Sequence, residues 1–214
     1  MKLIAPTIPV DLKINNDLKS ALLRGKLLEG SLVSNQDLTE SSFKTVRIAE
    51  SKFQNISLLQ TKFDKLTVND VTFEKCSFVA SDLAGSDWYY IKLSGSQCSG
   101  VQLQESVLKD VLFDNCKLDM ANFRNSKLTN VVFRDCLLNE ADFYTTELNN
   151  VQFLGCQIDK VQFVDAKLKN VDFRTSSLSR IGGLESLKDA KISSLQLVTL
   201  APELAQALGI NVED

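Results

Sequence analysis

The sequence predicts an all-β solenoid, in which the backbone winds into stacked coils. From Val111 onward the chain repeats itself every twenty residues, beginning with VLFDNCKLDMANFRNSKLTN and VVFRDCLLNEADFYTTELNN. Every fifth residue from Val33 to Leu178, thirty positions in all, is apolar. All twelve Phe residues and the only Trp, Trp88, fall in this register. A fixed period of this length is typical of repeat proteins that stack one unit on the next.

The five-residue period indicates how each coil is built. Neither the 3.6-residue period of a helix nor the two-residue alternation of a strand produces it. A chain that turns a corner every five residues does, and four such quarters close one roughly square coil. Coils stacked at about 4.8 Å can exchange backbone hydrogen bonds as in a parallel sheet. Residues twenty apart then become neighbours, and the rod is expected to be about 36 Å long.

The register positions are predicted to fill the interior in four columns, one for each side of the coil. Columns of Phe alternate with columns of Leu, so that large and small side chains fill the interior together. A second, smaller inward position lies two residues before each register position. The predicted core includes Phe113, Phe123, Phe133, Phe143, Phe153, Phe163, Phe173, Leu118, Leu128, Leu138 and Leu148.

The five cysteines are predicted to belong to the core and not to a metal site. Cys76, Cys116, Cys136 and Cys156 share the small inward position of one column, and Cys98 occupies a register position. Their spacing is the coil period instead of a C-x-x-C pair, and the sequence contains no His to complete a mixed zinc site. A small buried hydrophobe is therefore the expected role. The odd number favours a reducing compartment.

One corner of the predicted coil carries a column of polar residues. Asn130, Asn150 and Asn170 recur there, preceded by Asp110 and Asp70. Stacked side-chain amides can hydrogen-bond to one another along such a column. We expect a structural ladder and not a binding site.

Several five-residue units resemble those of the pentapeptide-repeat proteins. Ala141-Asp142-Phe143, Ala121-Asn122-Phe123 and Ser81-Asp82-Leu83-Ala84-Gly85 are similar to the A(D/N)LXX unit of that family. The resemblance covers about 150 residues and implies a right-handed quadrilateral β-helix. It implies little about activity, because most members have none assigned. Some members protect DNA gyrase and topoisomerase IV and are described as mimics of duplex DNA.

The two ends of the chain depart from the repeat. We expect an N-terminal cap over residues 1–30, the repeats over 31–180 and a C-terminal helical cap or dimerisation segment over 181–214. Asn16 is expected to cap a short helix ending at Gly25. Ser194 is expected to cap a helix over Leu195 to Leu200, and Pro202 to start or kink a second helix through Leu208. The C-terminal segment has more apolar side chains than one short helix needs. They are expected to cover the last coil, a second subunit or both. The resemblance implies a dimer, because several resembling proteins dimerise through a C-terminal helical segment. The candidate dimerisation residues are Leu197, Leu200, Leu204 and Leu208.

Composition argues against several classes of function. The net charge is −3, and residues 31–180 hold 17 Lys and Arg against 19 Asp and Glu, so no basic stripe for nucleic acid is expected. Without His, the commonest general base is missing, and no phosphate-binding glycine motif occurs. No apolar run is long enough to span a bilayer. We therefore expect a cytoplasmic protein that is not an enzyme, with no catalytic residues, cofactor or metal.

Two functions remain after these exclusions. The first is a rigid, non-catalytic protein-interaction scaffold of unknown target. The alternative, implied by the resemblance, is a DNA mimic that binds and protects gyrase or topoisomerase IV, against which the nearly neutral repeats and their unbroken register argue. A homodimer through the C-terminal segment is a further expectation. The candidate interaction residues are Trp88, Tyr89, Tyr90, Leu112 and Val132.

Overall fold

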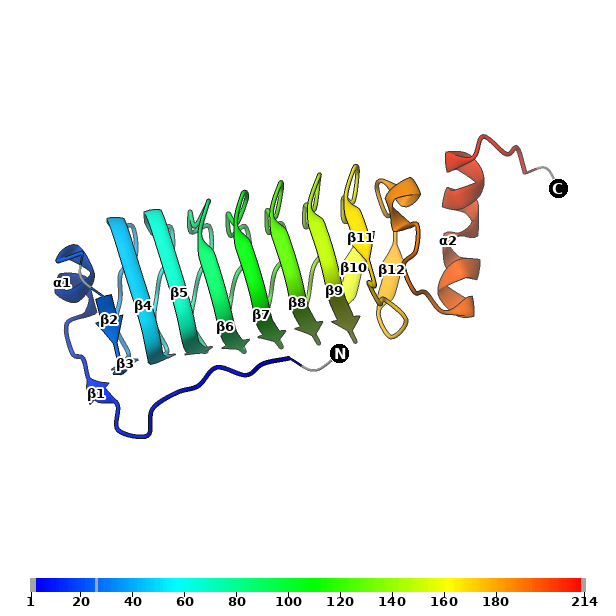
Figure 1. Ribbon diagram of the computed structural model, residues 1–214. Coiled ribbons are helices and arrows are strands. Elements are labelled where there is room, and N and C mark those ends of the chain that lie inside the picture. The colour runs from blue at the N-terminus through cyan, green and yellow to red at the C-terminus, as the bar shows by residue number, and fades with distance from the viewer. Residues whose placement is uncertain (1–2, 26, 213–214) are drawn as a thin grey trace.

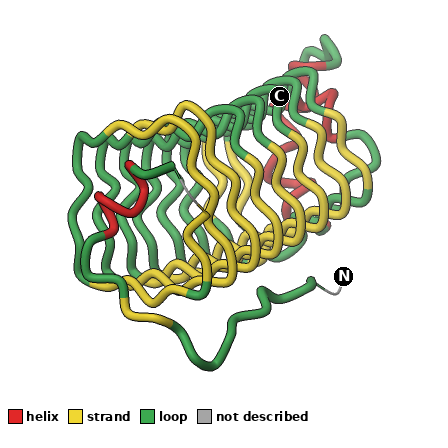
Figure 2. The backbone as a smooth tube through the Cα atoms, turned by 60° about the vertical axis from the view of Figure 1, so that its left-hand side comes forward, coloured by secondary structure: helices red, strands yellow, loops and turns green. Residues whose placement is uncertain are grey.

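The chain forms a rod of stacked four-sided coils (Figures 1 and 2). The structure is a computed structural model that describes residues 3–25 and 27–212. Residues 1–2 and 26 of the predicted N-terminal cap and residues 213–214 of the predicted C-terminal segment lie outside the described residues. All strand pairings are parallel, in a ten-stranded and a two-stranded sheet. The fold is the expected quadrilateral β-helix with a helical cap at each end. Its strands are β1 (Lys13–Ile14), β2 (Leu27–Glu29), β3 (Ser31–Ser34), β4 (Ser42–Gln54), β5 (Lys62–Glu74), β6 (Asp87–Ser94), β7 (Val107–Asp114), β8 (Lys127–Arg134), β9 (Glu147–Leu154), β10 (Gln157–Asp159), β11 (Lys167–Lys169) and β12 (Ser177–Ser179).

The pairing of neighbouring strands confirms the twenty-residue coil. Phe113 on β7 pairs with Phe133 on β8, which pairs with Phe153 on β9. The sheet order follows the chain order along the rod, because each coil hydrogen-bonds to the next one. Each residue therefore lies between the residues twenty before and twenty after it.

Corners form because one residue in each five adopts a left-handed backbone conformation. Positive φ angles recur at almost every fifth position along the coils, for example 53° at Asn130 and 54° at Asn150. Asn and Asp tolerate this conformation better than most residues. Gly95 and Gly100 lie at two of these corners, with φ angles of 59° and 67°.

The core follows the five-residue register. Every register position from Val33 to Leu178 is buried, except that Leu168 is half-buried. Leu168 lies on β11, the last strand on its side of the rod, so no further strand covers it. The Phe rings of adjacent coils stack with centroids 4.7–5.2 Å apart in the columns from Phe113 onward.

Most small polar residues at the second inward position satisfy their own hydroxyl groups, although the Ser41 hydroxyl has no partner among the described residues. The hydroxyls of Ser126 and Thr146 donate to the carbonyls of Leu103 and Phe123, each at 2.6 Å. In both cases the acceptor belongs to the preceding coil, 23 residues earlier. The hydroxyls thus reinforce the coil stack, because their buried groups are paired.

The N-terminal cap is the helix α1 (Leu18–Leu23), which buries Leu18 and Leu22 against the first coils. Its N-cap is Asp17, whose side chain accepts a hydrogen bond from the Ser20 amide at 3.1 Å. The predicted cap at Asn16 is wrong. That residue precedes the helix by two positions, whereas the cap residue must be the one immediately before it.

The coil stack continues past Arg180. Gly182 bridges to Gln162, and Lys191 bridges to Asp172, with the 3₁₀ helix η1 (Leu184–Leu187) between them. At the other end, β1 pairs with β3 before residue 30. The solenoid is therefore longer at both ends than residues 31–180.

The C-terminal cap is one helix, α2 (Ser194–Ala207), with Pro202 inside it. The predicted cap at Ser194 is wrong, and so is the predicted second helix at Pro202, because one helix runs through that residue. Ser193 caps the helix through a reciprocal pair of hydrogen bonds with Gln196. The Gln196 side chain also donates to the carbonyls of the last coil at 2.6 and 2.7 Å, which holds the helix across the rod end. No described helix has the length and apolarity that a membrane span needs.

Candidate functional site

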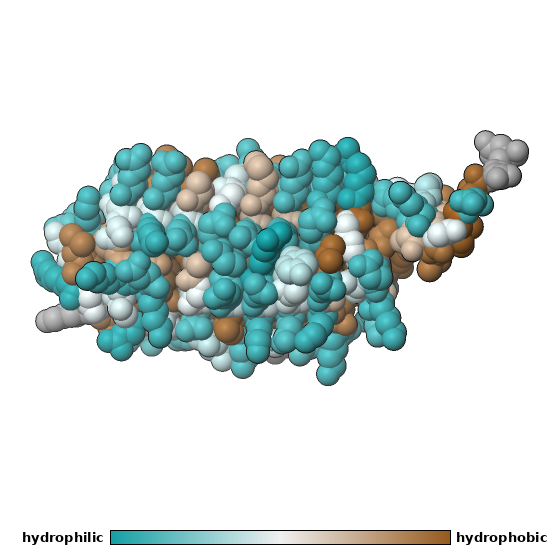
Figure 3. Space-filling view, turned by 90° about the horizontal axis from the view of Figure 1, so that it is seen from above, coloured by the Kyte–Doolittle hydropathy of each residue, from teal (hydrophilic) through white to brown (hydrophobic). Residues whose placement is uncertain are grey.

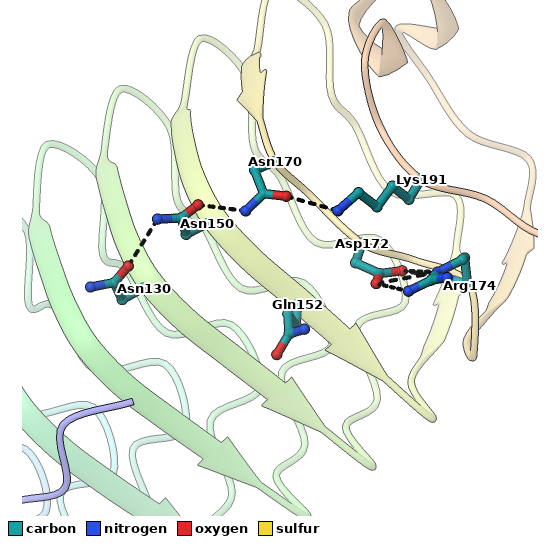
Figure 4. Close-up of a pocket in the computed structure, with 7 residues that line it drawn as sticks. All are labelled: Asn130, Asn150, Gln152, Asn170, Asp172, Arg174 and Lys191. Atoms are coloured by element: carbon teal, nitrogen blue, oxygen red, sulfur yellow. Dashed lines mark hydrogen bonds and ion pairs between the residues drawn. The ribbon is translucent and has the colours of Figure 1, made fainter. Parts of the chain in front are cut away.

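The polar corner column forms the expected hydrogen-bonded ladder (Figure 4). The amide nitrogen of Asn150 donates to the side-chain oxygen of Asn130 at 3.2 Å, and that of Asn170 donates to Asn150 at 2.6 Å. Asn130 in turn donates to Asp110 at 3.3 Å. Lys191 closes the ladder, because its Nζ donates to Asn170 Oδ1 at 2.9 Å.

A polar groove runs along this ladder at the C-terminal end of the rod. Its volume is about 530 Å³. We call it the amide groove, and it is lined by Asn130, Asn150, Gln152, Asn170, Asp172, Arg174 and Lys191.

An ion pair fixes the charge at one side of the amide groove. The Arg174 guanidinium donates from Nε and Nη2 to the Asp172 carboxylate at 3.0 and 2.8 Å. Hydrogen bonds from Arg174 outweigh desolvation and hold the pKa of Asp172 below its usual range. With Asp172 neutralised by Arg174, Lys191 leaves the groove with one net positive charge.

The N-terminal segment lies along the same corner column, nearer the start of the rod (Figures 1 and 4). The main-chain N–H of Thr7 donates to Asp70 Oδ1 at 2.8 Å, and that of Ile4 donates to Asp110 Oδ1 at 3.3 Å. The predicted cap does not include this contact. The sequence does contain a signal for this contact. The column has the carboxylates Asp70 and Asp110 where the N–H groups of the N-terminal segment bind, and it has Asn residues beyond that segment.

Two of the candidate interaction residues are not surface residues. Trp88 is 1% exposed, and its indole N–H donates to the Ser86 hydroxyl at 2.8 Å. Val132 is 4% exposed, because it is short and lies between the longer Leu112 and Gln152 side chains of the neighbouring strands. The predicted patch of Leu112 and Val132 is therefore wrong as an exposed surface.

The remaining candidates are half-buried. Tyr89, Tyr90 and Leu112 each keep part of their surface accessible. Tyr90 occupies the corner between Asp70 and Asp110, with a φ of 56°. It therefore lies in the column that the N-terminal segment follows and not in a free patch.

The four candidate dimerisation residues divide into two pairs. Leu200 is 1% exposed and Leu204 packs against the core, so both cover the last coil. Leu197 and Leu208 are 51% and 75% exposed. The helix α2 thus caps the rod with one face and presents apolar side chains on others, seen as brown atoms at that end in Figure 3.

The cysteines lie where the register places them. All five are buried and free. Burial raises the pKa of Cys76 from 9.0 to about 11 and that of Cys98 well above its ordinary value. Within residues 3–25 and 27–212, no group of acidic, Cys or His side chains is arranged to hold a metal ion.

Several acidic side chains on the rod surface form ion pairs with basic ones. Arg124 binds Asp142 at 2.6 Å, and Lys160 binds Glu140 at 3.0 Å. Such pairs join residues on adjacent coils because the coil period brings them together. Exposed pairs of this kind add little stability.

Comparison with known proteins gives a family and a fold. A search of curated proteins finds no match to the sequence. Among solved structures, the full-length plasmid-mediated fluoroquinolone resistance protein QnrB1 is 17% identical, with 87% of this chain and 91% of that one covered and a TM-score of 0.40. HetL, a pentapeptide repeat protein involved in heterocyst differentiation regulation from the cyanobacterium Nostoc, is 16% identical over 77% of this chain and 86% of that one, with a TM-score of 0.38.

The family assignment depends on the repeat itself and not on these distant structures. The model of the pentapeptide repeat region matches residues 27–103 and 106–181, which together are well over half of the chain. The same residues form the coils described above. The chain is therefore a member of the pentapeptide-repeat family.

Proposed function

We propose that this protein is a non-catalytic rod that binds another protein along its solenoid faces. The observation that carries the proposal is the continuous parallel bridging from β1 to Lys191, which fixes the outward side chains of each coil relative to the next. A surface ordered before binding loses little conformational entropy when a partner docks. Pentapeptide-repeat β-helices are in general structural or interaction proteins, which supports the same function.

The test is capture of a partner with the full chain, followed by reconstitution of the complex from purified proteins. The expected result is a stoichiometric complex whose chemical cross-links map to the solenoid faces. Cross-links confined to the segments before residue 27 and after Lys191 would overturn the proposal. We further propose a reducing compartment such as the cytoplasm, since the five buried cysteines are free.

The alternative partner is DNA gyrase or topoisomerase IV. A duplex mimic needs a continuous acidic stripe to compete for a cationic DNA groove. The ion pairs on the rod surface do not favour it, because they neutralise carboxylates such as Asp142 and Asp172. Inhibition of gyrase supercoiling at micromolar protein, or protection from a fluoroquinolone, would move this alternative to first place.

We also propose that the exposed face of α2 joins two copies of the chain. Leu195 and Val198, 76% and 71% exposed, extend the apolar surface of Leu197 and Leu208. Leu195 and Val198 lie three residues apart and so share one helix face at the end of the rod. Sedimentation equilibrium is expected to show a dimer that Val198→Glu dissociates, while a wild-type monomer at all concentrations would contradict it.

A further inference from the structure

The chain shows how its corner column can hold the main chain of a peptide. Residues 3–9 form no helix or strand. Pro6 and Pro9 favour an extended backbone at the prolines themselves and at Ala5 and Ile8, the residues directly before them. The contacts of Ile4 with Asp110 and of Thr7 with Asp70 use main-chain N–H groups alone. Ile4 and Thr7 are both exposed, so the column recognises the backbone in preference to these side chains.

The spacing of these two contacts matches the geometry of an extended proline-containing peptide. Asp70 and Asp110 are two coils apart, or about 9.6 Å at the spacing of a parallel sheet. A polyproline II helix returns to the same orientation every three residues, over about 9.3 Å. Ile4 and Thr7 are three residues apart. Every third N–H of such a peptide therefore meets every second coil of the rod.

The column continues beyond the N-terminal segment into the amide groove. From Asn130 to Lys191 it covers three further coil steps, about 14 Å, which is room for about five extended residues. None of the residues that line the groove belongs to the N-terminal segment.

The amides of the groove keep hydrogen-bonding capacity for a ligand. A side-chain amide has two N–H donors and an oxygen with two lone pairs. In the ladder, Asn150 uses one N–H toward Asn130 and one lone pair toward Asn170. Its second donor and second lone pair match the carbonyl and N–H groups of a peptide backbone.

We propose that the amide groove binds a short, extended, proline-containing segment of a partner protein through its main chain, in the way that the corner column binds residues 4–7. The inference rests on the proposed interaction function and adds to it the place of binding and the chemistry of the partner. The net positive charge left by Lys191 favours a neutral or acidic segment over a basic one.

The experiment measures binding of a fluorescent peptide to the full chain. The probe is the capped peptide LIAPTIPV, the sequence of residues 3–10. The expected result is saturable fluorescence anisotropy. Asn150→Gly and Asn170→Gly are each expected to weaken binding about tenfold, as loss of one or two hydrogen bonds implies. Glycine suits these corners, where φ is 54° in both cases, so the variants keep the fold.

Two controls isolate the main-chain contacts. Asn115→Gly changes an exposed asparagine with a φ of 53° that does not line the groove, and it is expected to leave binding unchanged. A probe methylated at the amide nitrogens of its first Ile and its Thr lacks the two donors and is expected not to bind. Circular dichroism melting of each variant confirms its fold.

The outcomes separate this inference from the proposed function. Absence of saturation up to millimolar peptide, or equal affinity for wild type and both groove variants, would overturn the groove. If a captured partner protein still bound the rod in either case, the interaction function would stand and the groove alone would be lost. Weaker partner binding by Asn150→Gly, with Asn115→Gly unchanged, would support both.

Discussion

The two halves of the rod, residues 31–110 and 111–180, share one register but pack differently. In the second half, Phe113 and Phe133 stack with centroids 5.0 Å apart and ring planes 5° from parallel. In the first half, Phe43 and Phe63 are 5.2 Å apart but tilted by 27°. A void of about 20 Å³ also lies in the first half, beside Phe53 and Phe73. Both halves bury the register, so burial alone does not produce parallel ring stacks.

The difference follows from the content of the columns. From Phe113 onward, identical or nearly identical residues follow one another at twenty-residue spacing, and each ring finds the same ring above and below. In the first half, the coil of Trp88 has smaller side chains at its other register positions, Leu83, Leu93 and Cys98. The same positions of the preceding coil hold Phe63, Phe73 and Phe78. The smaller neighbours make room for the indole. Mixed columns fill the same volume only by tilting their rings.

The backbone differs as well. The strands β4 and β5 each run for 13 residues, whereas β6 to β9 each run for 8. The long strands pass Thr45 and Lys65, which lack the positive φ found at most other fifth positions. The amide groove lies over the regular half, whereas the N-terminal segment runs from Asp110 back to Asp70 over the other. A regular coil stack holds the groove residues at equal intervals.

The largest effect is expected from a charge in the regular stack. Phe133 is fully buried between Phe113 and Phe153, so Phe133→Asp places an unpaired carboxylate among rings. We expect the free energy of unfolding to fall by more than about 5 kcal/mol, measured by urea denaturation. A variant with native circular dichroism and an unchanged midpoint would refute the inward position of Phe133.

A smaller loss is expected from removing the large ring of the irregular half. Trp88→Leu leaves a cavity beside Phe73 and Phe78 and removes the indole hydrogen bond to Ser86. The expected cost is about 3 kcal/mol. Adding Leu93→Phe is expected to recover part of it, because the ring then extends the column of Phe73 and Phe113. A double variant less stable than Trp88→Leu would show that column content does not govern the packing.

A glycine-to-alanine substitution is expected to cost more stability at the end of the rod than in its middle. At Gly183 the φ is 74°, and a Cβ atom would approach the Val164 nitrogen to 2.4 Å. Gly183→Ala is therefore expected to cost about 2 kcal/mol in thermal or chemical unfolding. Gly85→Ala is the control, because its Cβ meets nothing within 4 Å; only the left-handed conformation, about 1 kcal/mol, opposes it. Equal losses would mean that the last turn adjusts freely.

The smallest effect at neutral pH is expected from the cysteine column. Cys76→Ser resembles the native Ser96 of the next coil, whose hydroxyl accepts a hydrogen bond from the Cys76 amide at 3.1 Å, so its effect at pH 7 should be about 0.5 kcal/mol or less. Burial raises the pKa of Cys76 from 9.0 to about 11. The stabilisation that comes from keeping the Cys76 thiol protonated is therefore complete below pH 9 and is lost as the pH rises through 11. Stability measured against pH should decline less steeply in alkali for Cys76→Ser than for wild type; parallel curves would contradict it.

The sequence is sufficient for the coil and its core but not for the contacts between distant segments. Every fifth residue had to be buried once four quarters close a coil, and even the ladder of Asn130 to Asn170 follows from that period. The docking of Ile4 and Thr7 has no period, since it joins residues 106 and 63 positions apart. Val132 has the alternation of an exposed residue, and its burial depends on the lengths of its two neighbours. Pro202 remains inside one helix because the packing of Leu200 and Leu204 against the core outweighs its local preference.

The central claim is that columns of identical residues make one part of the coil stack more rigid than another. Native-state hydrogen exchange with mass spectrometry tests it on the unaltered protein. Residues 42–74 begin 15 residues after Leu27, the first residue of β2, and residues 144–176 end 15 residues before Lys191, the last bridged residue, so both lie at a similar depth in the stack. The account predicts slower exchange and a higher opening free energy in 144–176. Equal protection, or slower exchange in 42–74, would contradict it.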